Sequence, residues 1–273
     1  MDQTIGFIGG GNMASSLIGG LINGGVIAAN KIVVFEPNAE KAQSLADQFG
    51  VSIAPDNVDL INRSQTVVIA VKPQVLQTVL SPLATNFQVS NPLIISIVAG
   101  ITASSIDQWL NGKFAIVRVM PNTPALVSQG ASGLFANNKV TSEQKDSATL
   151  LMNAVGCSAW VETEQDIDSI TALSGSGPAY FMLFIQSLID SAVKAGLDPK
   201  TAKTLAVKTA SGAAELIQSS DTPLQTLIDN VTSPGGTTEQ ALLSFHKSNL
   251  PDIVNDAFNA AKNRSEELAK ELS

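Results

Sequence analysis

The sequence predicts an α/β protein in which a doubly wound sheet is followed by an all-α C-terminal domain. A short apolar run at residues 4–8 precedes three consecutive glycines and then apolar residues at helical spacing. Strand-like and helix-like segments alternate over the first 120 residues, as in a sheet covered by helices on both faces. Beyond residues 162–168 the strand-like runs cease and helical periodicity takes over. We therefore expect two domains, residues 1–162 and residues 163–273.

The turn after the first strand has the spacing of a dinucleotide-binding fingerprint, Gly9-x-Gly11-x-x-Ala14. Gly9 allows a tight turn, and the missing side chain at Gly11 lets a pyrophosphate reach backbone N–H groups at the helix N-terminus. Ala14 is small enough for the helix to pack closely against the strand. The pattern predicts a Rossmann-type nucleotide site. A glycine-rich strand–helix turn without a ligand is the alternative.

Further strands and helices follow in order. The predicted strands lie at residues 32–35, 51–54, 67–71, 93–98 and 115–120, and the predicted helices between them at residues 37–49, 74–86 and 104–110. The run VVIAV at residues 67–71 is apolar throughout, which indicates burial on both faces, as in a parallel sheet.

The second half is predicted to be helical. Its helices are expected at residues 178–195, 199–218, 224–230, 238–247 and 251–272. The first of them is apolar nearly all round. A single small helical domain is not expected to cover such a helix, which predicts dimerisation through this half of the chain.

Composition narrows the classes of function. The net charge of −8 argues against nucleic acid, because phosphate binding requires clustered lysine and arginine. The single cysteine, Cys157, excludes an intrachain disulfide and fits a reducing compartment. No targeting segment is visible, and the longest apolar run of the most apolar helix, residues 179–185, is far short of the roughly 20 residues that a membrane span needs. We expect a cytoplasmic protein without a membrane partner.

Ligands of open α/β sheets bind beyond the carboxyl ends of the strands. Three short segments follow predicted strands: AVKP at residues 70–73, IVAG at 97–100 and MPNTP at 120–124. Lys72 could place a cation near a phosphate, or it could be a solvated lysine. Glu36 follows the second strand, where a carboxylate can bind both ribose hydroxyls of NADH but would repel a 2′-phosphate. A solvated glutamate near a helix N-terminus is the alternative.

Two glycine–serine loops precede helices in the second half, SGSGP at residues 174–178 and SPGGTT at 233–238. Each offers free N–H groups at a helix N-terminus, which can hold a carboxylate without a positive side chain. Ordinary capping by serine and threonine is the alternative for either loop.

Acid–base candidates are scarce, with one histidine, His246, and one tyrosine, Tyr180. We expect His246 on the surface of a helix, and Tyr180 as a packed ring with a bonded hydroxyl. The sequence shows neither a His/Cys cluster with metal-ligand spacing nor a Ser-His-Asp arrangement. The chemistry should therefore need little proton transfer by the protein, as in hydride delivery from a cofactor to an already protonated carbon–nitrogen double bond.

Together these motifs closely resemble the pyrroline-5-carboxylate reductase family over essentially the whole length. The matching segments are FIGGGNMA at residues 7–14, AVKP at 70–73, MPNTP at 120–124, LSGSGPAYF at 173–181 and DNVTSPGGTT at 229–238. The first is shared with many Rossmann enzymes, whereas the last two together are specific to this family. The resemblance implies reduction of (S)-1-pyrroline-5-carboxylate to L-proline with NADPH or NADH, the last step of proline biosynthesis. It also implies a homodimer with interlocked helical domains, and larger rings of dimers occur in the family.

The resemblance further implies the residues of the site. The cofactor would contact Gly9, Gly10, Gly11, Asn12, Met13, Glu36, Asn57, Ala70, Val71, Lys72, Pro73 and Ala99. The substrate carboxylate would lie on the loop formed by Ser233, Gly235, Gly236, Thr237 and Thr238, with the Thr238 hydroxyl near the ring nitrogen as the catalytic contact.

Some alternatives stay open. Many relatives carry Ser, Asn or Arg where this chain has Glu36, so a strict preference for NADPH is not implied. A β-hydroxyacid dehydrogenase or an imine reductase would also join a Rossmann domain to helices, with Lys194 or Lys203 as the counterpart of the dehydrogenases' catalytic lysine. A non-catalytic nucleotide sensor is the alternative from a different class.

Overall fold

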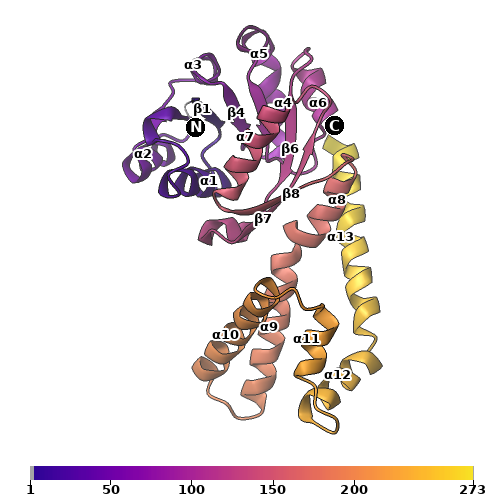
Figure 1. Cartoon of the computed structure of the whole chain (residues 1–273). Coiled ribbons are helices and arrows are strands. Elements are labelled where there is room, and N and C mark those ends of the chain that lie inside the picture. Colours follow the sequence, from indigo (N-terminus) through magenta and orange to yellow (C-terminus); the bar gives the residue numbers. More distant parts are fainter. Residues whose placement is uncertain (1–2, 273) are drawn as a thin grey trace. The chain divides into compact units, whose positions relative to one another are not determined.

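The computed structural model describes residues 3–272, which divide into two compact units. Of the described residues, the first unit comprises 3–176 together with 261–272, and the second comprises 177–260. Figure 1 shows the sheet and helices of the first unit and the helices of the second.

The first unit is built on one eight-stranded sheet with the order β3-β2-β1-β4-β5-β6-β7-β8. The strands are β1 (Ile5–Ile8), β2 (Ile32–Phe35), β3 (Ser52–Ile53), β4 (Thr66–Ile69), β5 (Leu93–Ser96), β6 (Ile116–Met120), β7 (Gly130–Ala136) and β8 (Gly156–Trp160). All neighbours run parallel except β6 and β7, which are antiparallel. The predicted fold class, a doubly wound sheet followed by helices, is confirmed.

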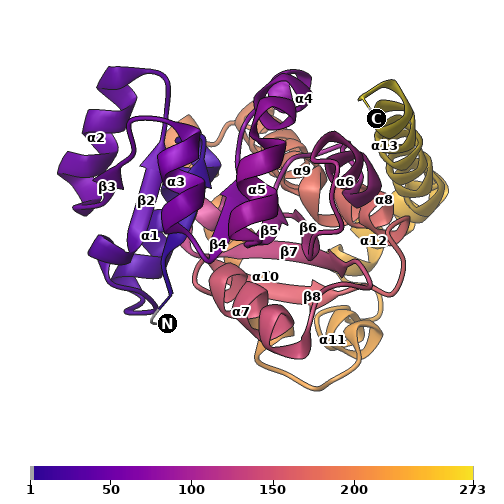
Figure 2. The ribbon, with the colours of Figure 1, turned by 90° about the horizontal axis from the view of Figure 1, so that it is seen from above.

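Helices cover both faces of this sheet (Figure 2). They are α1 (Asn12–Asn23), α2 (Ala39–Phe49), α3 (Asn57–Arg63), α4 (Pro73–Leu80), α5 (Ala84–Ser90), α6 (Ala103–Trp109), α7 (Ser142–Asn153) and α8 (Asp166–Ile170). Short turns of helix also occur: η1 (Ala29–Lys31), η2 (Ser81–Leu83), η3 (Thr123–Val127) and a π-helix, η4 (Thr171–Gly175). One core packs α1, α2 and α7 on the sheet, and the other packs α3, α4, α5 and α6. Both faces of the central strands are therefore buried, as the VVIAV run predicts.

The predicted helix at residues 74–86 is wrong in one respect, because it is divided into α4, η2 and α5. Pro82 lies in the break. Proline has no N–H to donate to the preceding turn, and its ring clashes with the carbonyl four residues before it. The apolar periodicity continues across this proline, so periodicity alone did not show the break.

Residues 123–161 contain two strands, β7 and β8, and the helix α7, which the sequence analysis did not predict. These strands are rich in small residues because their neighbours are close. A Cβ built on Gly133 would be 2.5 Å from Ile170 Cγ2, and one on Gly156 would clash with the Gly130 carbonyl.

The compact units do not coincide with the predicted domains, because the first unit extends to residue 176 and also includes residues 261–272. The packing of Ile170 on Gly133 keeps α8 and η4 with the sheet. The buried Ser265 hydroxyl donates to Asp168 Oδ1 at 2.6 Å, which ties the end of the last helix to α8.

The second unit is entirely helical. It contains α9 (Gly177–Lys194), α10 (Pro199–Gln218), α11 (Leu224–Asn230), α12 (Thr237–Lys247) and the first part of α13 (Leu250–Leu272), up to residue 260, and α9 packs against α10. Many of its large apolar side chains are exposed, including Phe181, Met182, Leu183, Leu205, Val231, Ile253 and Val254. By length and composition alone, the stretch Asp166–Lys194 could also cross a membrane, and 11% of its most apolar window is buried.

Candidate active site

The carboxyl ends of the parallel strands meet at one edge of the sheet, and the strand order reverses beside β1, between β2 and β4. Ligands of open α/β sheets bind at such a switch point. The Gly9 N–H donates to the Phe35 carbonyl, and the Ala70 N–H donates to the Ile8 carbonyl, both at 2.9 Å. The loops after β1, β2 and β4, which hold most of the predicted cofactor contacts, therefore lie side by side.

The turn after β1 forms a cradle of backbone. Gly9 has a φ of +101°, and a Cβ built on it would be 2.7 Å from the Ala70 carbonyl oxygen, so a side chain there would be strained. A Cβ on Gly11 would meet nothing within 4 Å, and Gly11 starts α1 without a side-chain cap. The N–H groups of Asn12 and Met13 have no acceptor within residues 3–272. Open space before free N–H groups at a helix N-terminus fits a pyrophosphate.

The Glu36 carboxylate lies against this cradle. Its Oε2 accepts a hydrogen bond from the Gly10 N–H at 2.9 Å, and its Oε1 accepts one from the Asn38 N–H at 3.1 Å. The side-chain cap of α2 is Asn38, whose Oδ1 accepts from the Lys41 N–H at 3.0 Å. Glu36 is therefore held in place by two backbone donors at the glycine turn, where a ribose would be expected.

The other predicted cofactor residues stand at helix starts and strand ends. Asn57 is the first residue of α3, and its Oδ1 is buried without a hydrogen-bond partner in the described chain. Such an orphaned acceptor fits a ligand group that donates to it. Lys72 is exposed and directly precedes Pro73, the first residue of α4. Ala99 is exposed in the loop after β5, next to Gly100 with a φ of +74°.

Asn122 joins two motifs that lie about 50 residues apart in the sequence. This side chain is 7% exposed, accepts a hydrogen bond from the Ala131 N–H at 2.9 Å and donates to the Ser174 carbonyl at 3.0 Å. A Cβ on Gly175 would be 2.5 Å from Met120 Cε, so the MPNTP and SGSG segments are in contact. Residues 171–175 form a π-helix here, a feature that is frequent at functional sites. Asn122 lies within a motif that the sequence singles out, but no role was predicted for it.

The loop before α12 uses some of its N–H groups internally. The Gly235 N–H donates to Glu239 Oε2 at 2.8 Å, and the Gly236 N–H donates to the Ser233 carbonyl at 2.9 Å. The N–H groups of Thr237 and Thr238 at the start of α12 have no acceptor in the part of the chain that the structure describes. The Gly235 and Gly236 N–H groups are therefore occupied within the loop. A carboxylate could bind only to the free N–H groups of Thr237 and Thr238.

The expectation for His246 is confirmed, and the one for Tyr180 is wrong. His246 is exposed in the last turn of α12, as predicted. Tyr180 is 37% exposed, so the expectation of a packed ring is wrong for the single chain, because the apolar surface of α9 around it is uncovered. No group of three or more His, Cys, Asp or Glu side chains among residues 3–272 could hold a metal ion.

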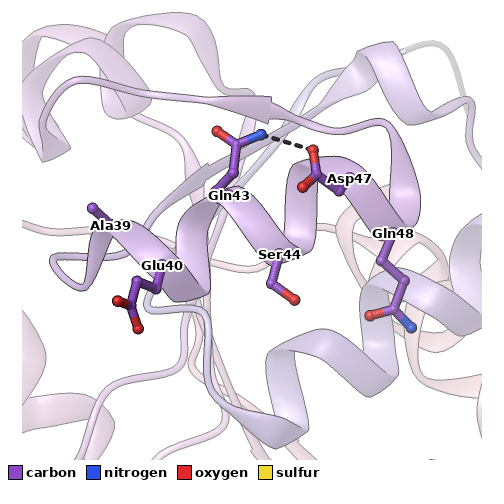
Figure 3. Close-up of a pocket in the computed structure, with 6 residues that line it drawn as sticks. All are labelled: Ala39, Glu40, Gln43, Ser44, Asp47 and Gln48. Carbon is purple, nitrogen blue, oxygen red and sulfur yellow. Dashed lines mark hydrogen bonds between the residues drawn. The ribbon is translucent and has the colours of Figure 1, made fainter.

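A shallow hollow on the exposed side of α2 lies outside this constellation (Figure 3). It is lined by Ala39, Glu40, Gln43, Ser44, Asp47 and Gln48. Its lining has two carboxylates and no cation, and Gln43 Nε2 donates to Asp47 Oδ1 at 2.7 Å. This hollow does not fit the phosphates of a dinucleotide, in contrast to the glycine cradle.

Comparison with known proteins places the whole chain. Residues 164–268 match the family model described as pyrroline-5-carboxylate reductase dimerisation, and residues 4–100 match the one described as NADP oxidoreductase coenzyme F420-dependent. The pyrroline-5-carboxylate reductase of Pseudomonas aeruginosa is 45% identical over 268 residues, covering 98% of this chain and 97% of that protein.

Solved structures agree. A pyrroline-5-carboxylate reductase from Coxiella burnetii superposes with a TM-score of 0.95 at 40% identity, covering 98% of this chain and 99% of the other. A Plasmodium falciparum pyrroline carboxylate reductase with NADP bound gives a TM-score of 0.87 at 34% identity, with 98% of each chain covered. The chain therefore belongs to the pyrroline-5-carboxylate reductase family.

Proposed function

We propose that the protein reduces (S)-1-pyrroline-5-carboxylate to L-proline with NADPH or NADH, the last step of proline biosynthesis. The observation that carries this proposal is the match to reductases of this name over 98% of the chain. In the proposal, residues 1–162 bind the dinucleotide, and residues 163–273 bind the substrate and form a cytoplasmic homodimer. A ring of dimers is the larger assembly that it allows, and neither nucleic acid nor a membrane is a partner.

The residues at the sheet edge fit a nicotinamide dinucleotide. The free N–H groups of Asn12 and Met13 would hold the pyrophosphate, and the Glu36 carboxylate would bind a ribose. Asn57 offers a buried acceptor that has no partner in the described chain. The remaining contacts would come from Ala70, Val71, Lys72, Pro73 and Ala99. When bound, the cofactor supplies a hydride.

The chain's own residues then hold the substrate. The N–H groups of Thr237 and Thr238 would bind the carboxylate, and the Thr238 hydroxyl would hydrogen-bond the ring nitrogen. If the imine arrives protonated, its carbon gains the hydride while its nitrogen keeps its proton, so C=N becomes CH–NH without a proton from the protein. The catalytic task of the protein is alignment, which suits a site with few acid–base groups.

Thr238 tests this mechanism. Thr238→Ala should cost about 1–3 kcal/mol of transition-state stabilisation, the scale of one hydrogen-bond partner, rather than abolish activity. Thr238→Ser keeps the hydroxyl and should recover most of the loss. His246→Gln and Tyr180→Phe are the controls, and both should stay within a few-fold of wild type. A collapse of kcat in either control, with fold and cofactor binding retained, would show that the protein supplies the proton.

The same steady-state assay separates the alternatives. A β-hydroxyacid dehydrogenase would oxidise hydroxyacids and leave pyrroline-5-carboxylate unreduced, and a nucleotide sensor would bind the cofactor without turnover. No observation on Lys194 or Lys203 favours the first of these.

A further inference from the structure

The loop before α12 already holds a carboxylate, and it is the chain's own. Glu239 Oε2 lies 2.8 Å from the Gly235 nitrogen, and the Glu239 side chain is half-buried. Glu239 is the third residue of α12, in the first turn, where negative charge is also favourable to the helix. The Glu239 side chain thus reaches back over the start of its helix and joins the helix to Gly235 of the preceding loop.

The bond falls at the point where the loop most needs support. Gly235 has a φ of +72°, a left-handed conformation, and the N-cap residue Gly236 has no side chain to cap the helix. Apart from the Gly236 N–H bond to the Ser233 carbonyl, the Glu239 carboxylate supplies the acceptor that fixes this turn.

The hydrogen bond from Gly235 to Glu239 also affects which N–H groups remain free for a ligand. With Gly235 and Gly236 engaged inside the loop, Thr237 and Thr238 are left with free N–H groups at the helix start. If the Glu239 contact were lost, Gly235 could leave its left-handed conformation, and the loop that leads into the free N–H pair would no longer be held in place. Backbone that must bind an anion gains affinity when it is ordered in advance.

We infer that Glu239 is a positioning residue for the substrate: by accepting the Gly235 N–H, it holds the Thr237 and Thr238 N–H groups where the pyrroline-5-carboxylate carboxylate binds. The inference rests on the proposed function and assigns Glu239 a role in substrate affinity, not in hydride transfer. A competing role has the opposite sign, since a carboxylate seated beside the subsite could repel the substrate or take its place.

Two variants separate the hydrogen bond from the charge. Glu239→Ala removes both, whereas Glu239→Gln keeps an acceptor oxygen and removes the charge. Asp198→Ala is the matched control, because Asp198 caps α10 in the same unit by accepting from the Thr201 N–H at 2.9 Å. Each full-length variant is assayed for the KM of pyrroline-5-carboxylate, the KM of the cofactor and kcat, with thermal melting alongside.

Glu239→Ala should raise the KM for pyrroline-5-carboxylate about tenfold, the scale of one lost hydrogen bond, with the cofactor KM within twofold of wild type. Glu239→Gln should lie within about threefold of wild type or bind substrate more tightly, and Asp198→Ala should lower the melting temperature without changing the substrate KM. An unchanged KM in Glu239→Ala would overturn the inference, and a lowered KM would make Glu239 a competitor of the substrate. Wild-type protein that does not reduce pyrroline-5-carboxylate would instead overturn the proposed function.

Discussion

At the residue scale, the glycine loops before α1 and α12 contain the same kind of hydrogen bond. In each, a carboxylate accepts a backbone N–H near a helix start, Glu36 from Gly10 and Glu239 from Gly235. These N–H groups lie just before the helix and have no backbone acceptor within it. Each bond fixes a flexible glycine backbone and leaves the next N–H groups of the helix unoccupied. An acidic protein can in this way present anion-binding backbone without clustered lysine or arginine.

Gly11 tests the nucleotide cradle. Gly11→Val should abolish NADH binding in a calorimetric titration, because the new side chain fills the space before the free N–H groups. It should leave the melting temperature nearly unchanged, since a Cβ at this position meets no protein atom within 4 Å. The matched control is Gly9→Ala, which should lower stability because that Cβ would lie 2.7 Å from the Ala70 carbonyl oxygen at a φ of +101°. Near-normal NADH affinity in Gly11→Val would contradict the fingerprint.

Glu36 should govern the choice of cofactor. A carboxylate fixed by two backbone donors cannot turn away from a 2′-phosphate without losing both bonds. We predict that NADPH is not strongly preferred, and that Glu36→Ser raises kcat/KM for NADPH relative to NADH about tenfold, if roughly 1.4 kcal/mol of repulsion is removed. Glu40→Ser, which removes an exposed carboxylate of α2, should leave this ratio unchanged. A constant ratio in Glu36→Ser would place the 2′-phosphate elsewhere.

At the element scale, the strands divide into those that the sequence reveals and those that it does not. The buried parallel strands β1, β2, β4 and β5 could be predicted because burial on both faces requires continuous apolar runs. In β7, with the sequence GASGLFA, crowding by Ile170 requires glycine at Gly133. The contact that packs α8 against this strand is thus the same one that removes the strand's sequence signal.

The candidate site divides in the same way. The glycine loops could be predicted because a turn with positive φ has a local cause that is visible in the sequence. The bond from Asn122 to the Ser174 carbonyl joins residues 52 apart, and no local pattern reveals it. Glu239 was missed for another reason, since a glutamate in the first turn of a helix has an ordinary explanation that hides its bond to Gly235.

Helix capping predicts a dependence of stability on pH. Hydrogen bonds from the Thr201 N–H and the Thr201 hydroxyl lower the pKa of Asp198 below its ordinary value. Because the Asp198 pKa is lower in the folded state than in the unfolded state, the ionised side chain stabilises the protein at pH values above its unfolded-state pKa. This contribution is lost as the pH falls through the folded-state pKa of Asp198. Between pH 6 and about pH 3, the melting temperature of wild type should therefore fall more than that of Asp198→Asn, because asparagine caps the helix without titrating. Parallel melting curves would contradict this.

At the scale of the whole molecule, the second unit exposes much of its apolar surface in a single copy. Its large apolar side chains are exposed on several helices, with Phe181 73% and Leu183 70% exposed on α9 alone. Monomeric soluble proteins rarely leave such a patch in water. The stretch Asp166–Lys194 passes the length and composition test for a membrane span for the same reason that it suits an interface: it is apolar and, in one chain, little covered. The family model for dimerisation matches residues 164–268, and the exposed side chains lie within that range.

We predict that the protein dimerises through α9. Each large apolar side chain buried between copies stabilises the dimer by about 1.5–3 kcal/mol, and two-fold symmetry counts every such contact twice. Light scattering should therefore find a dimer for wild type and a monomer with little activity for the Phe181→Glu/Leu183→Glu double variant, because the interface would then have to bury unpaired carboxylates. Val89→Glu is the matched control: Val89 is 80% exposed on α5 of the first unit, so its variant should remain dimeric and active. A compact wild-type monomer with full activity at assay concentrations would show instead that the apolar helices are covered in some other way.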